Sequence, residues 1–193
     1  METVDWATGR WTTPPVRSQQ TPDGLLVEAK EGSDAWRTTS YGVIHDDEHA
    51  LIAPLGREQA IEVDFWARFS QQFDQAGVFL RVDESHWVKA GVEFADGTPQ
   101  LGAVVTDVRS DWSVAPVPDW GGRLVTIRAS RSGDAITVRA RVEGEDFRLV
   151  RLIPMSPDVE LEAGPFTCSP TRAGLEVLFT GWRLTEPDAS LHP

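Results

Sequence analysis

Residues 74–97 read DQAGVFLRVDESHWVKAGVEFADG, and this stretch predicts two neighbouring strands joined by a short loop. Within residues 86–94, alternate side chains are apolar, as the buried face of a strand requires: Val88, Ala90, Val92 and Phe94. The opposite face carries an aromatic ring, a cation, no side chain and an acid: Trp87, Lys89, Gly91 and Glu93. A merely solvated face would be expected to carry Thr, Ser, Lys and Glu. The bare glycine between two charges therefore indicates a more specific role for this face.

Two turns put three strands in register. A three-residue loop at 83–85 places Gly77 opposite Gly91, and the Asp-Gly pair at 96–97, a preferred hairpin turn, places Gly91 opposite Gly102. Other expected cross-strand pairs are Arg81–Trp87, Phe79–Lys89, Gln75–Glu93 and Glu93–Gln100. A slip of one residue would turn the apolar side chains out of the core, so the register is strongly specified. The sequence thus predicts a row of glycines across three strands, here called the glycine row: Gly77, Gly91 and Gly102.

The glycine row would form a shallow trench on one face of the sheet. Gln75, Glu93 and Gln100 would wall one side, and Phe79 and Lys89 the other. Glycine in a strand often marks a place where a ligand or another backbone approaches closely. It also serves as a device for strand twist and curvature. The residues leave both interpretations open.

Strand-like alternation recurs along the whole chain, and no long window shows helical spacing. It predicts strands at 24–30, 60–69, 76–82, 86–94, 101–107, 123–129, 135–142 and 175–184. Many short strands separated by turn residues predict an all-β fold, a two-sheet antiparallel sandwich or jelly roll. We expect a single domain over residues 1–186 and a polar tail over 187–193 in which His192 is disordered.

The composition narrows the class of partner. A formal net charge of −12 at pH 7 argues against binding to nucleic acid or to an anionic membrane. It is compatible with a neutral ligand such as a sugar. Cys168 is the one cysteine, so no intrachain disulfide can form, which favours a reducing compartment. No signal peptide or membrane-spanning segment is visible, and we expect a soluble cytoplasmic protein of undecided oligomeric state.

Aromatic and polar residues outside the glycine row suggest how a sugar could be held. A sugar site needs a flat apolar platform and planar polar groups for vicinal hydroxyls. DAWRTTSYG, residues 34–42, supplies Trp36 and Tyr41, and SDWSV, residues 110–114, supplies Asp111 and Trp112. Both segments are expected to be loops, and each tryptophan is equally compatible with a lid on the end of the sandwich.

One further tryptophan is expected at the trench. Residues 61–69 bury alternate apolar side chains and turn Glu62, Asp64 and Trp66 outward. A plausible register sets Trp66 beside Gly77, where the indole would cover one end of the trench.

A glycosidase is a weaker alternative. EVDFWA, residues 62–67, invites comparison with the E-x-D-x-x-E strand of laminarinase-like hydrolases, but Ala67 stands where the last acid is needed. Hydrolysis of this type takes two placed carboxylates, so Glu62 and Asp64 are interpreted as an ordinary polar face. Glu93 with Asp74 or Asp111 remains a possible catalytic pair.

No cofactor or metal is expected. HDDEH, residues 45–49, could in principle ligate a metal, but a solvated acidic turn is the simpler interpretation. The sequence does not exclude metal binding there. Cys168 is expected to be buried packing rather than a nucleophile.

At this point the residues also indicate a family. The motif across 74–97, together with WRTTSYG at 36–42 and SDWSV at 110–114, resembles the domain of unknown function family DUF1349, whose fungal members are regulation-of-enolase-like proteins. The likeness runs from about Trp11 to Leu184. The positions that match the family motif are Trp36, Tyr41, Gly42, Asp74, Gln75, Gly77, Arg81, Asp83, Trp87, Lys89, Gly91, Glu93, Asp111 and Trp112. The resemblance implies a concanavalin A-like jelly roll of the lectin and glucanase superfamily, whose relatives commonly bind carbohydrate on the concave sheet, and no established activity.

Three functional hypotheses follow. The leading one is a lectin-like, carbohydrate-binding protein without established catalysis: a small saccharide lies along the glycine row, stacked on Trp36, Trp66 or Trp112. Gln75, Lys89 and Glu93 would hydrogen-bond it, and Lys89 and Glu93 are expected to pair with each other when the site is empty. The second is a sugar-active enzyme that uses Glu93 with Asp74 or Asp111. The third is a metabolic regulator that docks on another protein, which an exposed apolar patch would favour.

Overall fold

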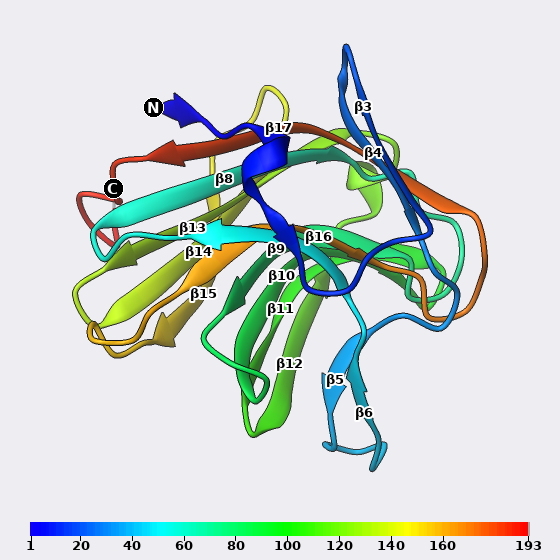
Figure 1. Cartoon of the computed structure of the whole chain (residues 1–193), viewed down its shortest axis with the longest axis horizontal. Helices are drawn as coiled ribbons and strands as arrows, with labels where there is room; N and C mark the ends of the chain where they lie inside the picture. The colour runs from blue at the N-terminus through cyan, green and yellow to red at the C-terminus, as the bar shows by residue number, and fades with distance from the viewer. Residues whose placement is uncertain (193) are drawn as a thin grey trace.

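The computed structural model describes residues 1–192, which fold into two large antiparallel sheets and one separate hairpin (Figure 1). The eight-stranded sheet runs in the order β15 (Arg148–Pro154), β14 (Ala135–Val142), β13 (Leu124–Ser132), β8 (Gln59–Trp66), β17 (Leu175–Thr185), β4 (Gly24–Ala29) and β3 (Arg17–Thr21), and β1 (Glu2–Thr3) pairs with β17. The seven-stranded sheet runs in the order β12 (Arg109–Pro116), β11 (Thr98–Asp107), β10 (His86–Ala95), β9 (Gln75–Arg81), β16 (Glu162–Cys168), β7 (His49–Pro54) and β2 (Arg10–Trp11). The hairpin consists of β5 (Ala35–Arg37) and β6 (Ile44–Asp46). The all-β sandwich expected from the sequence is confirmed.

The described residues contain little helix. Two short 3-10 helices, η1 (Trp6–Thr8) and η2 (Pro118–Trp120), are the helices that residues 1–192 form. Neither has the length or apolar character that a membrane crossing would need.

Each predicted strand is present, but the alternation missed others. β16 is buried on both faces over most of its length, and β7 begins with four consecutive buried residues, so neither shows a period of two. Pro165 within β16 is also atypical of a central strand, because proline lacks the backbone N–H that a strand pairing uses. Residues 110–114, expected to be a loop, form part of β12 at the edge of its sheet.

The predicted register of the central strands is confirmed. Gly91 of β10 pairs with Gly77 of β9 and with Gly102 of β11. The turn residues Asp96 and Gly97 have φ angles of 53° and 81°, the left-handed conformation that a two-residue hairpin of this kind requires. The glycine row therefore exists as the sequence predicted.

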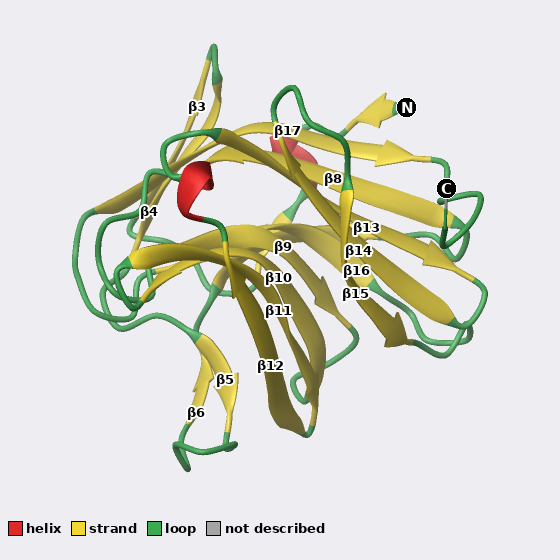
Figure 2. Ribbon diagram, turned by 180° about the vertical axis from the view of Figure 1, so that it is seen from behind, coloured by secondary structure: helices red, strands yellow, loops and turns green. Residues whose placement is uncertain are grey.

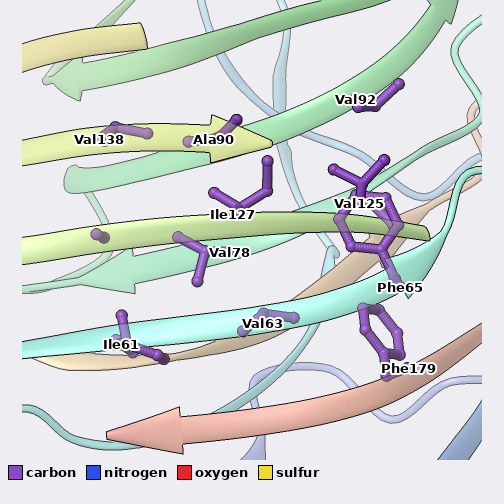
Figure 3. Packing of buried hydrophobic residues seen from close by; sticks show 14 of the residues in the cluster. Ile61, Val63, Phe65, Val78, Ala90, Val92, Val125, Ile127, Val138 and Phe179 are labelled. Atoms are coloured by element: carbon purple, nitrogen blue, oxygen red, sulfur yellow. The ribbon is translucent and has the colours of Figure 1, made fainter. Parts of the chain in front are cut away.

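The core lies between the two sheets. Figure 3 shows side chains from β8, β13 and β17 packed against those of β9 and β10. The labelled members are Ile61, Val63, Phe65, Val78, Ala90, Val92, Val125, Ile127, Val138 and Phe179, each at most 2% exposed. Burying each of the larger of these side chains stabilises the fold by about 1.5–3 kcal/mol. This packing fixes which face of each sheet points into the core and which points outward.

A second apolar cluster lies on the outer face of the seven-stranded sheet. Chain residues 30–48, between β4 and β7, carry the β5–β6 hairpin, which both ribbon views place next to β12 (Figures 1 and 2). Ala35 is fully buried in one cluster with side chains of the sheet: Ala50, Ile52, Phe79, Trp87, Val104, Phe166 and Cys168. The start of the hairpin segment thus packs against part of the face that the sequence suggested was an open trench.

The C-terminal segment is tied to the eight-stranded sheet. Asp188 accepts hydrogen bonds from Arg128 at 2.8 Å and from Arg139 at 2.9 Å, and the carbonyl of Leu191 accepts one from Arg139. These contacts hold the first part of the expected tail against the sheet, and Pro193 lies outside the described residues.

Candidate functional site

A hollow of about 470 Å³ lies between the β5–β6 hairpin and the outer face of the seven-stranded sheet. It is referred to below as the hollow, and its lining residues are Asp34, Trp36, Tyr41, Val43, His45, Phe73, Lys89, Glu93, Val104, Trp112, Pro170 and Thr171. A narrow recess adjoins it, lined among others by Gln75, Gly91, Gln100, Gly102 and Val114. The volume falls in the range of about 300–1,000 Å³ typical of small-molecule sites.

The floor of the hollow holds a buried ammonium group. Lys89 of β10 donates to Asp34 Oδ1 at 2.7 Å and to Gln75 Oε1 at 2.9 Å. Burial by itself would lower the pKa of Lys89, but the nearby negative groups, Asp34 first, raise it above its ordinary value, so the side chain is a cation. The expected pairing of Lys89 with Glu93 is wrong, because Asp34 from the segment before β5 reaches the ammonium instead.

Glu93 is the unsatisfied group of this floor. Its Oε1 is buried and has no hydrogen-bond partner within residues 1–192. Burial raises the pKa of Glu93 to about 7; Lys89 opposes this shift, whereas Asp34 and Asp96 add to it. A buried carboxylate without a partner is costly, so such a group marks a functional candidate. Glu93 lines both the hollow and its recess.

Three aromatic rings form one wall. Trp36 lies edge-on to Tyr41, with ring centroids 5.6 Å apart, and edge-on to Trp112 at 6.4 Å. Trp36 Nε1 donates to the carbonyl of Thr39 at 2.9 Å, which orients the indole within the hairpin. Tyr41 is 64% exposed and Trp112 40% exposed, unusual values for rings of this size. The wall therefore presents apolar ring surface to the hollow.

The glycine row has a packing explanation. A Cβ at Gly91 would overlap the carbonyl oxygen of Ala76, and one at Gly77 would overlap that of Ala90. The absent side chains thus permit close approach of neighbouring strands, the structural alternative of the two left open above. Gly77 is buried and lines neither the hollow nor the recess, whereas Gly91 and Gly102 line the recess.

The expected placement of Trp66 is wrong. Trp66 ends β8, pairs with Leu124 and belongs to the eight-stranded sheet, whereas Gly77 pairs with Phe166 in the other sheet. The guanidinium of Arg68 lies 4.9 Å from the centre of the Trp66 ring. The connection between β8 and β9 crosses from one sheet to the other, which alternation along the strands cannot reveal.

The two acids offered as partners of Glu93 are engaged elsewhere. Asp74 is fully buried and accepts from Arg172 at 2.8 Å and from the backbone N–H groups of Ser70 and Gln71. Asp111 accepts from Arg151 of β15, 2.7 Å away. Trp112 lines the hollow, and because side chains alternate along β12, its neighbour Asp111 points away from it.

Residues 45–49 are only partly the solvated turn that the sequence suggested. His45 lines the hollow, but Glu48 and His49 are buried. Burial lowers the pKa of His49, whose ring nitrogens lie 3.0 Å from the backbone N–H of Lys30 and the carbonyl of Thr13. In the described chain no three His, Cys, Asp or Glu residues group as metal ligands. Cys168 is buried, and burial raises the pKa of its thiol, which is inert packing.

Sequence reasoning missed several members of the hollow, above all Asp34, His45 and Phe73. Asp34 stands directly before the Ala-Trp pair of the hairpin, and an acid beside a suspected aromatic platform was the available signal. Phe73 precedes Asp74 in the connection to β9 and has a positive φ of 69°, which no sequence pattern announces. Of the predicted residues, the structure brings together Trp36, Tyr41, Gln75, Lys89, Gly91, Glu93, Gly102 and Trp112.

Comparison with protein families gives one match that spans most of the chain. The model described as Protein of unknown function (DUF1349) matches residues 11–187. Regulation of enolase protein 1 of Saccharomyces cerevisiae is 34% identical over 179 residues, which cover 93% of this chain and 90% of that protein.

Solved structures extend the comparison. A functionally unknown protein from Saccharomyces cerevisiae superposes with a TM-score of 0.89 and 32% identity, over 96% of this chain and all of that one. A xylan β-1,4-xylosidase from Bacillus halodurans superposes with a TM-score of 0.72 at 17% identity, over 96% of this chain but 39% of the enzyme. The second likeness is one of fold, and it concerns a part of that enzyme.

Proposed function

Because the chain belongs to the family described as Protein of unknown function (DUF1349), we propose a function from the chemistry of its own hollow: the protein binds a small saccharide there, without a catalytic role. The aromatic wall and the carboxyl group of Glu93 line one cavity. A pyranose ring presents an apolar face of C–H groups and an edge of hydroxyls, and these two parts fit those two features.

The single observation that carries the proposal is Glu93. Its buried Oε1 lacks a hydrogen-bond partner within the described chain, yet it sits beside a cavity large enough for a sugar. Hydroxyl donors of a saccharide would satisfy it, with Trp112 stacked on the ring. That one fold neighbour is a xylan-cleaving enzyme is consistent with a saccharide ligand.

Lys89 has a supporting role in the proposal. Two hydrogen bonds to Asp34 and Gln75 fix its ammonium, which has three donors, so one donor is left for a ligand oxygen. Gln100 faces the recess and adds a planar amide. We place this binding in the cytoplasm, since the single Cys168 is a buried free thiol that a reducing compartment preserves.

Calorimetric titration with a panel of mono- and oligosaccharides tests the proposal. Trp112→Ala should weaken binding at least about tenfold, because the ring supplies a stacking surface. Trp66→Ala is the matched control, since it removes the same side chain from the other sheet and should leave affinity unchanged. Circular dichroism of each variant checks that it is folded. If no saccharide binds, or if Trp66→Ala weakens binding as much as Trp112→Ala, the proposal is wrong.

A sugar-active enzyme is the second candidate, and the pKa of Glu93 favours it. A carboxyl group with a pKa raised to about 7 by burial is protonated often enough near neutral pH to act as a general acid. Asp34 would be its partner carboxylate in the hollow, in place of Asp74 or Asp111. Lys89 holds Asp34 in an ion pair through Oδ1, so this oxygen is already engaged. Release of reducing ends from an oligosaccharide, lost in Glu93→Gln, would establish this candidate.

A protein-docking role rests on the exposed end of the hairpin, which shares Tyr41 and Val43 with the lining of the hollow. Tyr41, Val43 and Ile44 at the end of the hairpin are at least 46% exposed, and exposed apolar groups of this kind often meet a partner protein. Loss of a partner from Tyr41→Ser, with saccharide affinity absent throughout, would favour this role.

A further inference from the structure

Counting the charges of the hollow gives an excess of one negative group. Asp34 and Lys89 neutralise each other across 2.7 Å. Glu93 then remains as an acid without a cation of its own. The two cross-strand neighbours of Glu93 are Gln75 on β9 and Gln100 on β11, and neither amide carries a charge.

The elements packed around Glu93 do not correct this excess. Asp96, in the turn between β10 and β11, and Asp34 both push the pKa of Glu93 upward, as like charges do. Cys168 on β16 is a neutral thiol because burial raises its pKa. His45 lines the opposite side of the hollow and is the one further titratable side chain in its lining that can become a cation. Within the described lining, Lys89 is the one permanent cation, and Asp34 already holds it.

The remaining walls are suited to a positive charge. Trp36, Tyr41, Trp112 and Phe73 line the hollow together with Glu93. The faces of aromatic rings attract cations, and the attraction grows where water is excluded. A carboxyl group with one buried and unpaired oxygen, as Glu93 has, gains most from a ligand that brings a positive donor. An ammonium group satisfies both features, and a hydroxyl satisfies only one.

We propose that the saccharide recognised in the hollow is an amino sugar, whose free ammonium group pairs with Glu93 while its ring lies against Trp112. This inference rests on the proposed saccharide-binding function and specifies its ligand class. It predicts a preference decided at a single substituent of the sugar ring.

Three oligosaccharides that differ only in the group at carbon 2 of each ring test this preference. Short β-1,4-linked oligomers of glucosamine, N-acetylglucosamine and glucose carry an ammonium, an acetamide or a hydroxyl group at carbon 2. In calorimetry at pH 6.5 and 0.15 M salt, the glucosamine oligomer should bind about tenfold or more tightly than the other two, as expected for a charge-assisted hydrogen bond in a recessed site.

The number of protons released or taken up on binding is an independent measure of the contact between Glu93 and the ammonium group. Glu93 is partly protonated at pH 6.5 and ionises when it pairs with an ammonium group, whereas an unprotonated sugar amine takes up a proton when it binds. The parent protein should therefore release more protons, or take up fewer, than Glu93→Gln on binding the glucosamine oligomer, measured as a dependence of the binding heat on the buffer. Glu93→Gln should also abolish the preference for the amine. Asp111→Asn is the matched control: it removes one negative charge from β12, two strands away from β10 in the same sheet, where Arg151 holds the side chain, and it should change neither quantity.

Each outcome bears on the inference in a defined way. Equal affinity for the three oligomers, or a preference for the amine that persists in Glu93→Gln, overturns the amino-sugar inference and leaves saccharide binding intact. Tetramethylammonium, a cation without a sugar ring, is the fourth probe in the same titration. Its binding without binding of any oligomer overturns the saccharide function itself. The absence of any binding to all four probes overturns both.

Discussion

Glu62 and Glu93, on the outer faces of the two sheets, have opposite surroundings. On the eight-stranded sheet, Glu62 accepts from Arg128 at 2.8 Å and from Arg183 at 3.2 Å. Asp64 accepts from Arg183 at 2.9 Å, and Asp188 bridges Arg128 and Arg139. On the seven-stranded sheet, Glu93 has an oxygen without a partner among the residues described.

The difference separates a structural use of charge from a functional one. Acids and arginines that satisfy each other hold strands together and leave nothing for a ligand. An acid that is desolvated and not paired raises the energy of the empty protein, and a ligand can lower it. The sequence showed the same residue type at both places, and only the partners distinguish them.

The largest effect is expected where the paired face is broken. Glu62→Gln should lower the free energy of unfolding by about 3 kcal/mol at pH 7, because two partly buried guanidinium groups lose their shared carboxylate. Urea denaturation measures the change. Asp158→Asn is the control, since its pair with Arg57 is largely exposed and should contribute less than about 0.5 kcal/mol. Equal losses in the two variants would contradict the distinction between buried and exposed pairs.

The floor of the hollow should resist an added methyl group. Gly91→Ala is expected to cost about 2–3 kcal/mol, because the new Cβ would overlap the carbonyl oxygen of Ala76 and force the strands apart. Gly121→Ala is the matched change at a glycine whose Cβ would have its nearest atom 3.6 Å away, and it should be close to neutral. Thermal unfolding of both variants decides the matter, and a tolerated Gly91→Ala would restore the view that the glycine row is open space.

Replacement of Glu93 by Gln should raise the free energy of unfolding, whereas replacement of Glu62 by Gln should lower it. Glu93 ionises near pH 4.5 in the unfolded chain and near pH 7 in the fold. Between these values the folded state binds more protons, so its stability falls as pH rises through this window. Glu93→Gln removes that loss and should stabilise the protein by about 2 kcal/mol at pH 8.

The pH dependence provides the internal control for this change. At pH 4 the Glu93 carboxyl group is protonated in the folded state and largely protonated in the unfolded chain, so Glu93→Gln and the parent protein should unfold at similar urea concentrations. A variant that is less stable than the parent at pH 8 would show that Glu93 is paired after all, and the contrast between the two faces would disappear.

The smallest effect on stability is expected at the rim. Tyr41 is 64% exposed, so Tyr41→Ala should change the free energy of unfolding by less than about 0.5 kcal/mol. It should nevertheless weaken saccharide binding several-fold, because the ring contacts Trp36 edge-on and extends the aromatic wall. Parallel denaturation and calorimetry separate the two quantities. A large loss of stability would assign Tyr41 to the fold instead of to the ligand.

The strands and their register followed from local rules. Alternation chose the buried face of β10, and the Asp-Gly turn at 96–97 fixed its pairing with β11, because hairpin geometry depends on a few neighbouring residues. β16 escaped notice because a strand buried on both faces has no alternation to detect. The sequence did not reveal to which sheet Trp66 belongs, for another reason. The connection from β8 to β9 passes from one sheet to the other, and such a passage leaves no local pattern in the sequence.

The amino-acid sequence by itself determined an all-β sandwich, the glycine row and the outward direction of Lys89 and Glu93, because each depends on pleat and turn chemistry over a few residues. Only the tertiary structure decided that Asp34 would take Lys89 as its partner and that Glu93 would be left without one. Asp34 reaches Lys89 across 55 residues of chain. Charge pairing depends on distance in space, and that distance is set by how the hairpin segment packs on the sheet.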